Sequence, residues 1–110
     1  MRVEFKTKQL ERVLCSEREM IKKFGDRAGK IKIRMGMLVS AKNLAEIPHI
    51  PPYNRHELKG QKAGQFAVDI NKNFRLLFEP NHHPIPLKPD GGYDLVQITS
   101  IKILGVEDYH

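Results

Sequence analysis

The sequence predicts a single α+β domain, with helices packed on one face of a mostly antiparallel sheet. Apolar residues recur at helical spacing between residues 7 and 41. Pro48, Pro51 and Pro52 then interrupt any helix, and the alternating apolar residues beyond them are typical of strands. Helices and strands that are segregated along a chain in this way favour the α+β class. The length of 110 residues suits one domain over positions 1–110.

The first elements are an N-terminal strand and a helix. Val3 and Phe5 alternate with charged residues, which predicts a short first strand. Apolar residues over 10–14 then follow helical spacing, and Thr7 is the expected N-cap of that helix.

Two further helices are expected before the prolines. Ser16 and Glu19 match a capping box, in which each residue satisfies a free amide of the first helical turn. Gly25 is a suitable stop for this helix, and Asp26 is expected to cap the next one. The third helix has an apolar stripe and ends near Ala41 or Ala45; its stripe consists of Ala28, Ile31, Met35 and Leu38.

The second half predicts strands. Residues 55–58 form a short strand, and the alternation over 65–79 predicts a hairpin. Residues 80–94, rich in proline and glycine, form a long loop or an irregular hairpin. Val96 begins the last strand, with a bulge near 99–100. The sheet face away from the helices is then free to bind a ligand.

The charge is concentrated in the first part of the chain. Residues 1–44 hold 12 Lys or Arg and 5 Asp or Glu, a net charge of +7, and the rest carries −1, which gives the overall +6. We call residues 1–44 the basic N-terminal part; Arg27, Lys30 and Arg34 are expected on the solvent face of its third helix. Such a segment attracts a polyanion. RNA, DNA, an acidic protein and simple solvation of a helical face all fit this charge.

Several classes of protein and site are disfavoured. No apolar run approaches the ~18 residues of a membrane span, and the start has no apolar region of a secretory signal, so a cytoplasmic location is expected. The single Cys15 excludes an internal disulfide framework and a cysteine-based zinc site. His82–His83 has no companion ligand pattern, so no metal site is expected there. Phosphate-binding glycine loops and the nucleophile-elbow motif are absent from the sequence.

The segment from Arg55 to Gly60 carries the first candidate site residues. His56 can exchange protons near neutral pH, and Lys59 can stabilise a negative charge. In a regular strand the two side chains would point to opposite faces, but Gly60 permits a bend that brings them together. His56 also alternates with Leu58, so a structural histidine remains the other interpretation.

Further candidates lie on the hairpin and at the end of the chain. Arg75 lies between Phe74 and Leu76 and is therefore expected on the sheet face away from the helices, as a functional or simply solvated side chain. The sequence ends in Asp108, Tyr109 and His110, which offer a carboxylate, a phenol that can stack on a base, and an imidazole. A solvated tail is the alternative.

Together these segments resemble the RelE/ParE superfamily of bacterial toxins, and within it the HigB-like "killer protein" group. The resemblance covers nearly the whole chain. It is carried by 55–60 with 64–69, then by Asn73-Phe74-Arg75 and the strand that follows, and by the terminal Glu107-Asp108-Tyr109-His110. Each piece alone is weak, but their order forms a strong joint signal.

The resemblance implies an α+β, RelE-like fold and an endoribonuclease that cuts mRNA on the ribosome. Attack by the 2′-hydroxyl needs no metal or other cofactor, and a cognate antitoxin, often with a helix-turn-helix, neutralises such toxins. The catalytic candidates by position are His56 and Lys59 from the first segment, Arg75 from the hairpin, and Asp108, Tyr109 and His110 from the tail, with His110 as the main proton-transfer group. Asn73 and Lys62 are expected to help bind the RNA.

Two alternatives remain open at this stage. ParE-like relatives share the fold and act on DNA gyrase without cleaving RNA, so the fold alone does not decide the function. Those relatives generally lack the terminal Asp-Tyr-His, which favours the ribonuclease. A non-toxic RNA-binding protein also fits the basic N-terminal part. The loop over 80–95 is longer than in the smallest family members, and its role is open.

Overall fold

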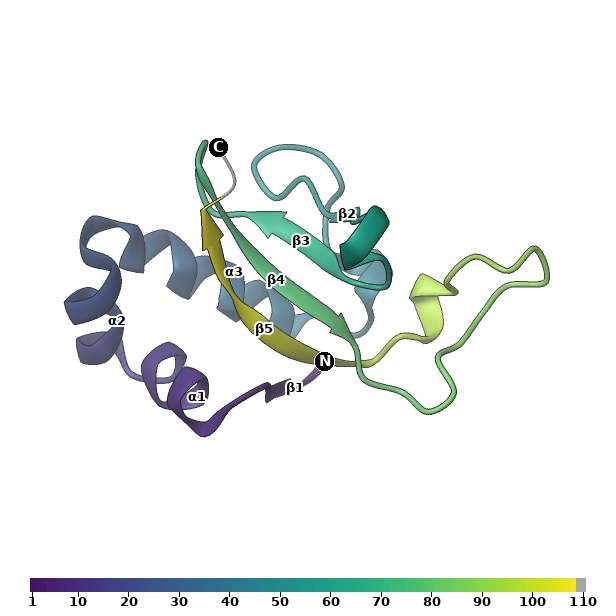
Figure 1. The fold of residues 1–110 in the computed structure, drawn as a ribbon, viewed down its shortest axis with the longest axis horizontal. Helices are drawn as coiled ribbons and strands as arrows, with labels where there is room; N and C mark the ends of the chain where they lie inside the picture. Colours follow the sequence, from purple (N-terminus) through teal and green to yellow (C-terminus); the bar gives the residue numbers. More distant parts are fainter. Residues whose placement is uncertain (109–110) are drawn as a thin grey trace.

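The computed structural model describes residues 1–108; residues 109 and 110 lie outside the described part. Three helices precede most of a five-stranded sheet (Figure 1). The elements are β1 (Arg2–Phe5), α1 (Lys8–Leu14), α2 (Glu17–Phe24), α3 (Ala28–Ser40), β2 (His56–Glu57), β3 (Phe66–Asp69), β4 (Phe74–Pro80) and β5 (Ser100–Asp108).

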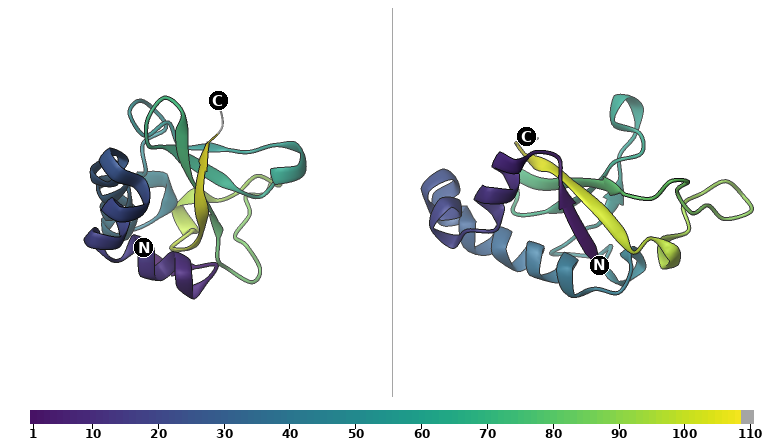
Figure 2. Two further views of the ribbon diagram at one scale, coloured as in Figure 1. Left: turned by 60° about the vertical axis from the view of Figure 1, so that its left-hand side comes forward. Right: turned by 90° about the horizontal axis from the view of Figure 1, so that it is seen from below.

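The strands are arranged in the order β1-β5-β4-β3-β2. β1 runs parallel to β5, and the other neighbouring pairs are antiparallel. The two views of Figure 2 show the three helices on one side of this sheet. The prediction of an α+β domain with helices on one face of a mostly antiparallel sheet is therefore confirmed.

The helix starts follow the sequence in two cases of three. The Thr7 hydroxyl accepts a hydrogen bond from the Leu10 N–H at 3.0 Å, and the Ser16 hydroxyl accepts one from the Glu19 N–H at 3.2 Å. The predicted cap Asp26 is wrong. Residues Gly25–Arg27 form a 3₁₀ turn that continues into α3, and Arg27 occupies the cap position with helical φ and ψ. Because a capping side chain needs an extended backbone at its own residue, this continuous turn leaves no place for one.

The main core lies between the helices and one face of the sheet. Leu76 and Phe78 on β4 point into it, and both are fully buried. The predicted stripe of α3 packs on the same core. The other buried members nearest the sheet are Phe66, Val68, Ile70, Ile98, Ile101 and Ile103.

The last strand differs from its prediction. Residues Leu95–Gln97 form a 3₁₀ turn, and β5 begins only at Ser100. The register shift lies opposite Leu77 and Phe78, which pair with Gly105 and Ile103, so Leu104 is the additional residue. Ile98, directly after the turn, is fully buried. A buried apolar residue at this position is also what a core-facing strand residue would be, which explains the wrong prediction.

The long loop between β4 and β5 extends away from the body of the domain (Figure 1). A single antiparallel bridge joins Leu87 to Tyr93, so the tip is an irregular hairpin. Among the described residues, no helix has the length and apolar character needed to cross a bilayer.

The core makes a direct prediction about stability. Replacing Leu76 with Ala removes a fully buried side chain from the centre of β4 and is expected to lower the free energy of unfolding by about 2–5 kcal/mol. The same replacement at Leu87, which is 57% exposed on the loop, is expected to change it by less than about 0.5 kcal/mol. Urea unfolding followed by circular dichroism measures both, and equal losses would contradict this description of the core.

Candidate functional site

The face of the sheet away from the helices, here called the open face, presents the alternate residues of β3, β4 and β5. Because successive side chains point to opposite faces, Arg75, Leu77 and Glu79 lie on the open face while Leu76 and Phe78 enter the core. A small apolar cluster forms the floor of this face; its members are Leu58, Ala67, Leu77 and Leu104. The expected position of Arg75 is confirmed.

A charge cluster stands beside this floor. Arg75 on β4 and Glu107 on β5 are directly opposite in the register, and the guanidinium donates two hydrogen bonds to one carboxylate oxygen, from Nε at 2.9 Å and from Nη2 at 2.6 Å. The Lys62 ammonium donates to the other oxygen of Glu107. Two cations from segments far apart in the sequence therefore share one anion.

His56 is placed on the same face by its pairing. It lies opposite Ala67 in the antiparallel pair of β2 and β3, and paired residues of neighbouring strands point to the same side. Its side chain is exposed, and Nδ1 lies 2.7 Å from the Asn54 carbonyl oxygen. Because Nδ1 is held by Asn54 and the ring is exposed, Nε2 remains available to contact a ligand, unlike the nitrogens of a buried structural histidine.

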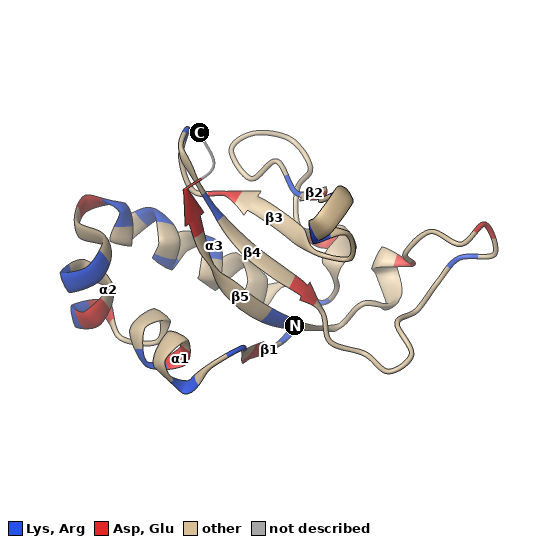
Figure 3. Ribbon diagram, viewed as in Figure 1, with Lys and Arg blue, Asp and Glu red and all other residues tan. Residues whose placement is uncertain are grey.

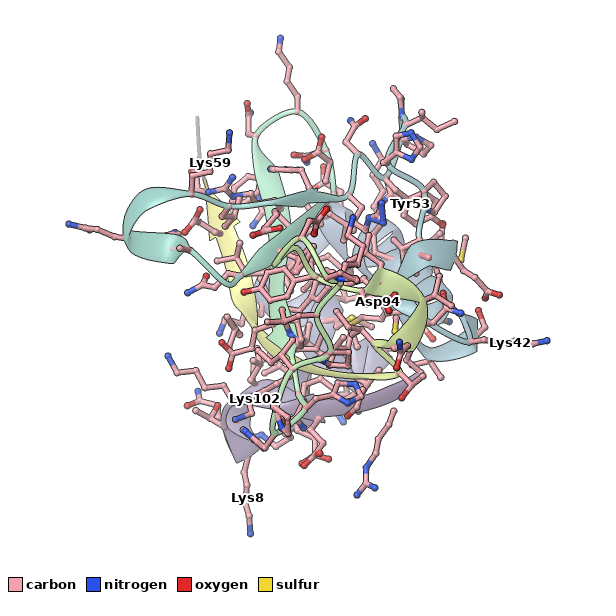
Figure 4. All side chains as sticks on the ribbon, turned by 90° about the vertical axis from the view of Figure 1, so that its right-hand side faces the viewer. Lys8, Lys42, Tyr53, Lys59, Asp94 and Lys102 are labelled. Carbon is pink, nitrogen blue, oxygen red and sulfur yellow. The ribbon has the colours of Figure 1, made fainter. Side chains whose placement is uncertain are left out.

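Lys59 lies at the edge of the sheet, between β2 and the 3₁₀ turn Gly60–Lys62. Its backbone is extended, and Gly60 follows with φ of +68°, a left-handed conformation that favours glycine. The chain therefore turns directly after Lys59, and the approach of Lys59 to His56 stays a prediction. In Figure 4 the exposed Lys59 lies in the upper part of the view, whereas Lys8 lies at the bottom.

The remaining expected residues are only partly described. Asn73 lies in the turn between β3 and β4, where its N–H donates to the Asn71 side chain at 2.9 Å. Asp108 is the last residue of β5 and is exposed, opposite Phe74. Tyr109 and His110 lie outside the described residues, so the structure does not test their proposed roles.

A buried arginine supports the end of β3. Arg34 on α3 donates hydrogen bonds to the carbonyl oxygens of Asp69 at 2.6 Å and Ile70 at 3.3 Å, and its guanidinium lies 4.7 Å from the Tyr53 ring centre. Asp69 in turn accepts a hydrogen bond from the Asn54 side chain at 2.9 Å. These bonds connect the helical layer to the strand next to Arg75.

The basic N-terminal part lies mostly on the helical layer, as the blue segments of α2 and α3 in Figure 3 show. The expectation that Arg34 faces solvent is wrong, because its side chain satisfies the two strand carbonyls. Arg27 also stacks on Phe74 at 3.9 Å. Most of the basic N-terminal part therefore lies away from the open face, and some of its charges have structural roles.

A pocket borders the open face at His56. It lies between the edge strand β2 and the long loop, and its lining includes Arg55, His56, Lys88 and Tyr93. Partial burial lowers the pKa of Arg55, whose Nη1 also donates to the Leu44 carbonyl at 3.3 Å. Sequence reasoning did not select Lys88, Tyr93 or Glu107. Alternation from Ile101 and Ile103 alone places Glu107 on the core side of β5, and only the bulge at Leu104 turns it to the open face, so the sequence pattern could not identify it.

Two other reactive side chains lie outside the open face. Cys15 follows α1 in the helical layer; partial burial, and next the charge of Glu11, raises the pKa of its thiol. His82 Nε2 accepts hydrogen bonds from the N–H groups of Thr99 and Ser100 at 3.1 and 3.2 Å, which fixes the loop to the start of β5. No group of three metal-ligating side chains occurs in the described 1–108.

The buried arginine gives a second prediction. Replacing Arg34 with Met leaves two strand carbonyls without their donor and is expected to lower the free energy of unfolding by about 1–3 kcal/mol. Arg18 on α2 is exposed, so the matched change Arg18→Met is expected to cost less than about 0.5 kcal/mol. Urea unfolding compares the two variants. If the Arg34 variant were as stable as the Arg18 variant, the supporting role of Arg34 would be refuted.

The sequence matches no protein-family model and no curated protein, but the structure resembles solved ones. YafQ from E. coli strain BL21(DE3) is 14% identical, with a TM-score of 0.59 over 98% of this chain and 93% of that chain. The YoeB/ParE toxin from Agrobacterium tumefaciens is 12% identical, with a TM-score of 0.53 over 100% of both chains. The structure of the E. coli DinJ–YafQ complex gives a similar match, with 14% identity and a TM-score of 0.57 over 98% of this chain and 93% of that chain. The chain therefore has the fold of the RelE/ParE superfamily of toxins.

Proposed function

We propose that this protein is the toxin of a type II toxin–antitoxin system and a ribosome-dependent mRNA endoribonuclease of the HigB-like kind. The observation that carries the proposal is the set of polar side chains on the open face of a RelE-type sheet. Arg75 and Lys62 gather there around one carboxylate, and His56 lies on the edge strand β2 of the same face, two strands from Arg75 on β4. Phosphate groups of RNA are recognised by such cations.

The proposed reaction uses the neighbouring 2′-hydroxyl of the RNA as its nucleophile. A base removes the proton from this hydroxyl, and an acid protonates the leaving 5′-oxygen. Lys59 and Arg75 stabilise the additional negative charge on the phosphate in the transition state. His56, Asp108 and His110 supply the proton-transfer groups. The chemistry requires no metal or other cofactor.

The other residues would position the RNA. Tyr109 is suited to stack on a base or orient the tail, because aromatic rings stack on the unpaired bases of single-stranded RNA. Lys62 and Asn73 would contact the backbone near the scissile linkage. The proposed place of action is the decoding site of the ribosome in the cytoplasm.

The proposed partner is a cognate antitoxin, expected to carry a helix-turn-helix. Two of the similar solved structures are complexes with another protein, the DinJ–YafQ complex from E. coli and the YoeB–YefM complex from Staphylococcus aureus. A small reading frame beside the gene, with helix-turn-helix patterning, would support the pair.

A ParE-like toxin that inhibits DNA gyrase is the second candidate, since one of the similar structures is described as a YoeB/ParE toxin. The terminal Asp108, Tyr109 and His110 favour the ribonuclease. The two functions differ in what fails first in a cell that expresses the protein. Pulse labelling is expected to show that protein synthesis stops before DNA synthesis; the reverse order would support the gyrase inhibitor.

The catalytic assignment gives a third prediction. Replacing Lys59 with Met is expected to slow ribosome-stimulated cleavage of mRNA by about 10²–10³-fold, because a cation that stabilises the transition state is lost. Lys59 is exposed, so the fold is expected to remain intact by circular dichroism. Lys8→Met, which removes an exposed cation at the start of α1, far below Lys59 in Figure 4, is the control and is expected to retain most activity. Wild-type cleavage by the Lys59 variant would refute the assignment.

A further inference from the structure

Glu107 was not among the residues expected at the site, yet it joins two of them. One oxygen of its carboxylate accepts two hydrogen bonds from Arg75, and the other accepts one from Lys62. Arg75 comes from β4, Lys62 from the turn after β2, and Glu107 from β5. A single carboxylate therefore holds together three segments that carry candidate site residues.

The two cations are held to different extents. The Arg75 side chain is 15% exposed and makes two bonds to one oxygen of Glu107. The Lys62 side chain is 41% exposed and reaches the carboxylate from a turn of three residues. An ion pair of a long, partly exposed lysine contributes little net free energy, so a competing anion can exchange with Glu107 at Lys62 more easily than at Arg75.

Carboxylate and phosphate oxygens accept hydrogen bonds from the same cations. Resting on the function proposed above, we propose that Glu107 is a positioning residue that fixes Arg75 and masks Lys62 until an RNA phosphate displaces its second oxygen. Lys62 then contacts the RNA backbone, while the pair between Glu107 and Arg75 remains in place. Without RNA, the Lys62 ammonium is therefore paired with the Glu107 carboxylate and is not available to a phosphate.

This arrangement predicts a gain of affinity when the mask is removed. Glu107→Gln keeps the shape of the side chain and an acceptor oxygen for Arg75, but removes the charge that holds Lys62. A Lys62 released in this way adds one phosphate contact, which increases RNA affinity and the steepness of its salt dependence. If Glu107 had only a structural role, replacing it with Gln would not increase the affinity for RNA.

The test measures binding of a short RNA with 2′-O-methyl riboses, which cannot be cleaved, by fluorescence anisotropy over a series of salt concentrations. Glu79→Gln is the matched control, because Glu79 lies on the same face of β4 and its loss changes the net charge equally. We expect E107Q to bind about tenfold tighter than wild type, with a salt slope steeper by about one. E79Q is expected to change the affinity less than about threefold.

A second variant shows whether the gain acts through Lys62. In a protein with Lys62→Met, adding E107Q is expected to give no further gain, because the masked cation is already absent. If circular dichroism shows that E107Q does not fold, Glu107→Asp replaces it, because the shorter side chain keeps the charge but no longer reaches Lys62 as well. This variant is expected to give a smaller gain in RNA affinity, and that gain must also vanish when Lys62→Met is added.

Three results would overturn the inference: equal affinities of E107Q and E79Q, a gain that persists with Lys62→Met, or weaker binding by a folded E107Q. If the wild type binds RNA and any of these results is found, the masking of Lys62 is contradicted but the proposed function is not. Absence of RNA binding by every variant, with ribosome-stimulated mRNA cleavage by the wild type intact, contradicts the masking of Lys62 alone. Absence of both contradicts the proposed function as well.

Discussion

The alternation of side chains along β4 is the constraint on which the rest of the structure depends. Leu76 and Phe78 enter the core beneath the helices, and this fixes Arg75 and Leu77 on the open face. A shift of one residue would exchange the two sets and place the arginine in an apolar core. The burial that stabilises the fold therefore also determines where the principal cation of the candidate site lies.

Much of this organisation could be predicted because it depends on short-range patterns. The spacing of apolar residues in α3 and the caps at Thr7 and Ser16 express local geometry, and the structure confirms them. The hairpin of β3 and β4 follows from the same kind of pattern. Arg75 could be assigned to a face because it lies within a regular alternation.

The errors arise where tertiary contacts override a local pattern. Arg34 has the spacing of the buried side of α3, three residues after Ile31 and four before Leu38, but its charge suggested a solvent-facing position. Its side chain is buried because it donates hydrogen bonds to the carbonyl oxygens of Asp69 and Ile70. Ile98 is buried directly after the 3₁₀ turn Leu95–Gln97, so its apolar character suggested a strand that begins only at Ser100. The bulge at Leu104 depends on the pairing of β4 with β5, which one strand's sequence does not specify. For the same reason the role of Glu107 emerges only when β4 and β5 are aligned.

The charges of the protein are divided between two layers. Most of the basic N-terminal part lies on the helices, whereas the open face carries fewer cations and balances two of them with a carboxylate (Figure 3). A surface rich in cations suits long-range attraction to a polyanion, and a paired cluster suits the fixed geometry that catalysis requires. The proposed toxin would use the first to approach the ribosome and the second to hold one linkage of the mRNA.

The most direct test of the proposed ribonuclease is cleavage of an mRNA that carries a single 2′-deoxynucleotide. The cut in the all-ribose message is first mapped with purified protein and translating ribosomes, and the nucleotide on the 5′ side of that cut is then replaced. The account predicts that this one replacement abolishes cleavage there, since the nucleophile is missing. Undiminished cleavage of the substituted message, or an intact all-ribose message under the same conditions, would contradict it.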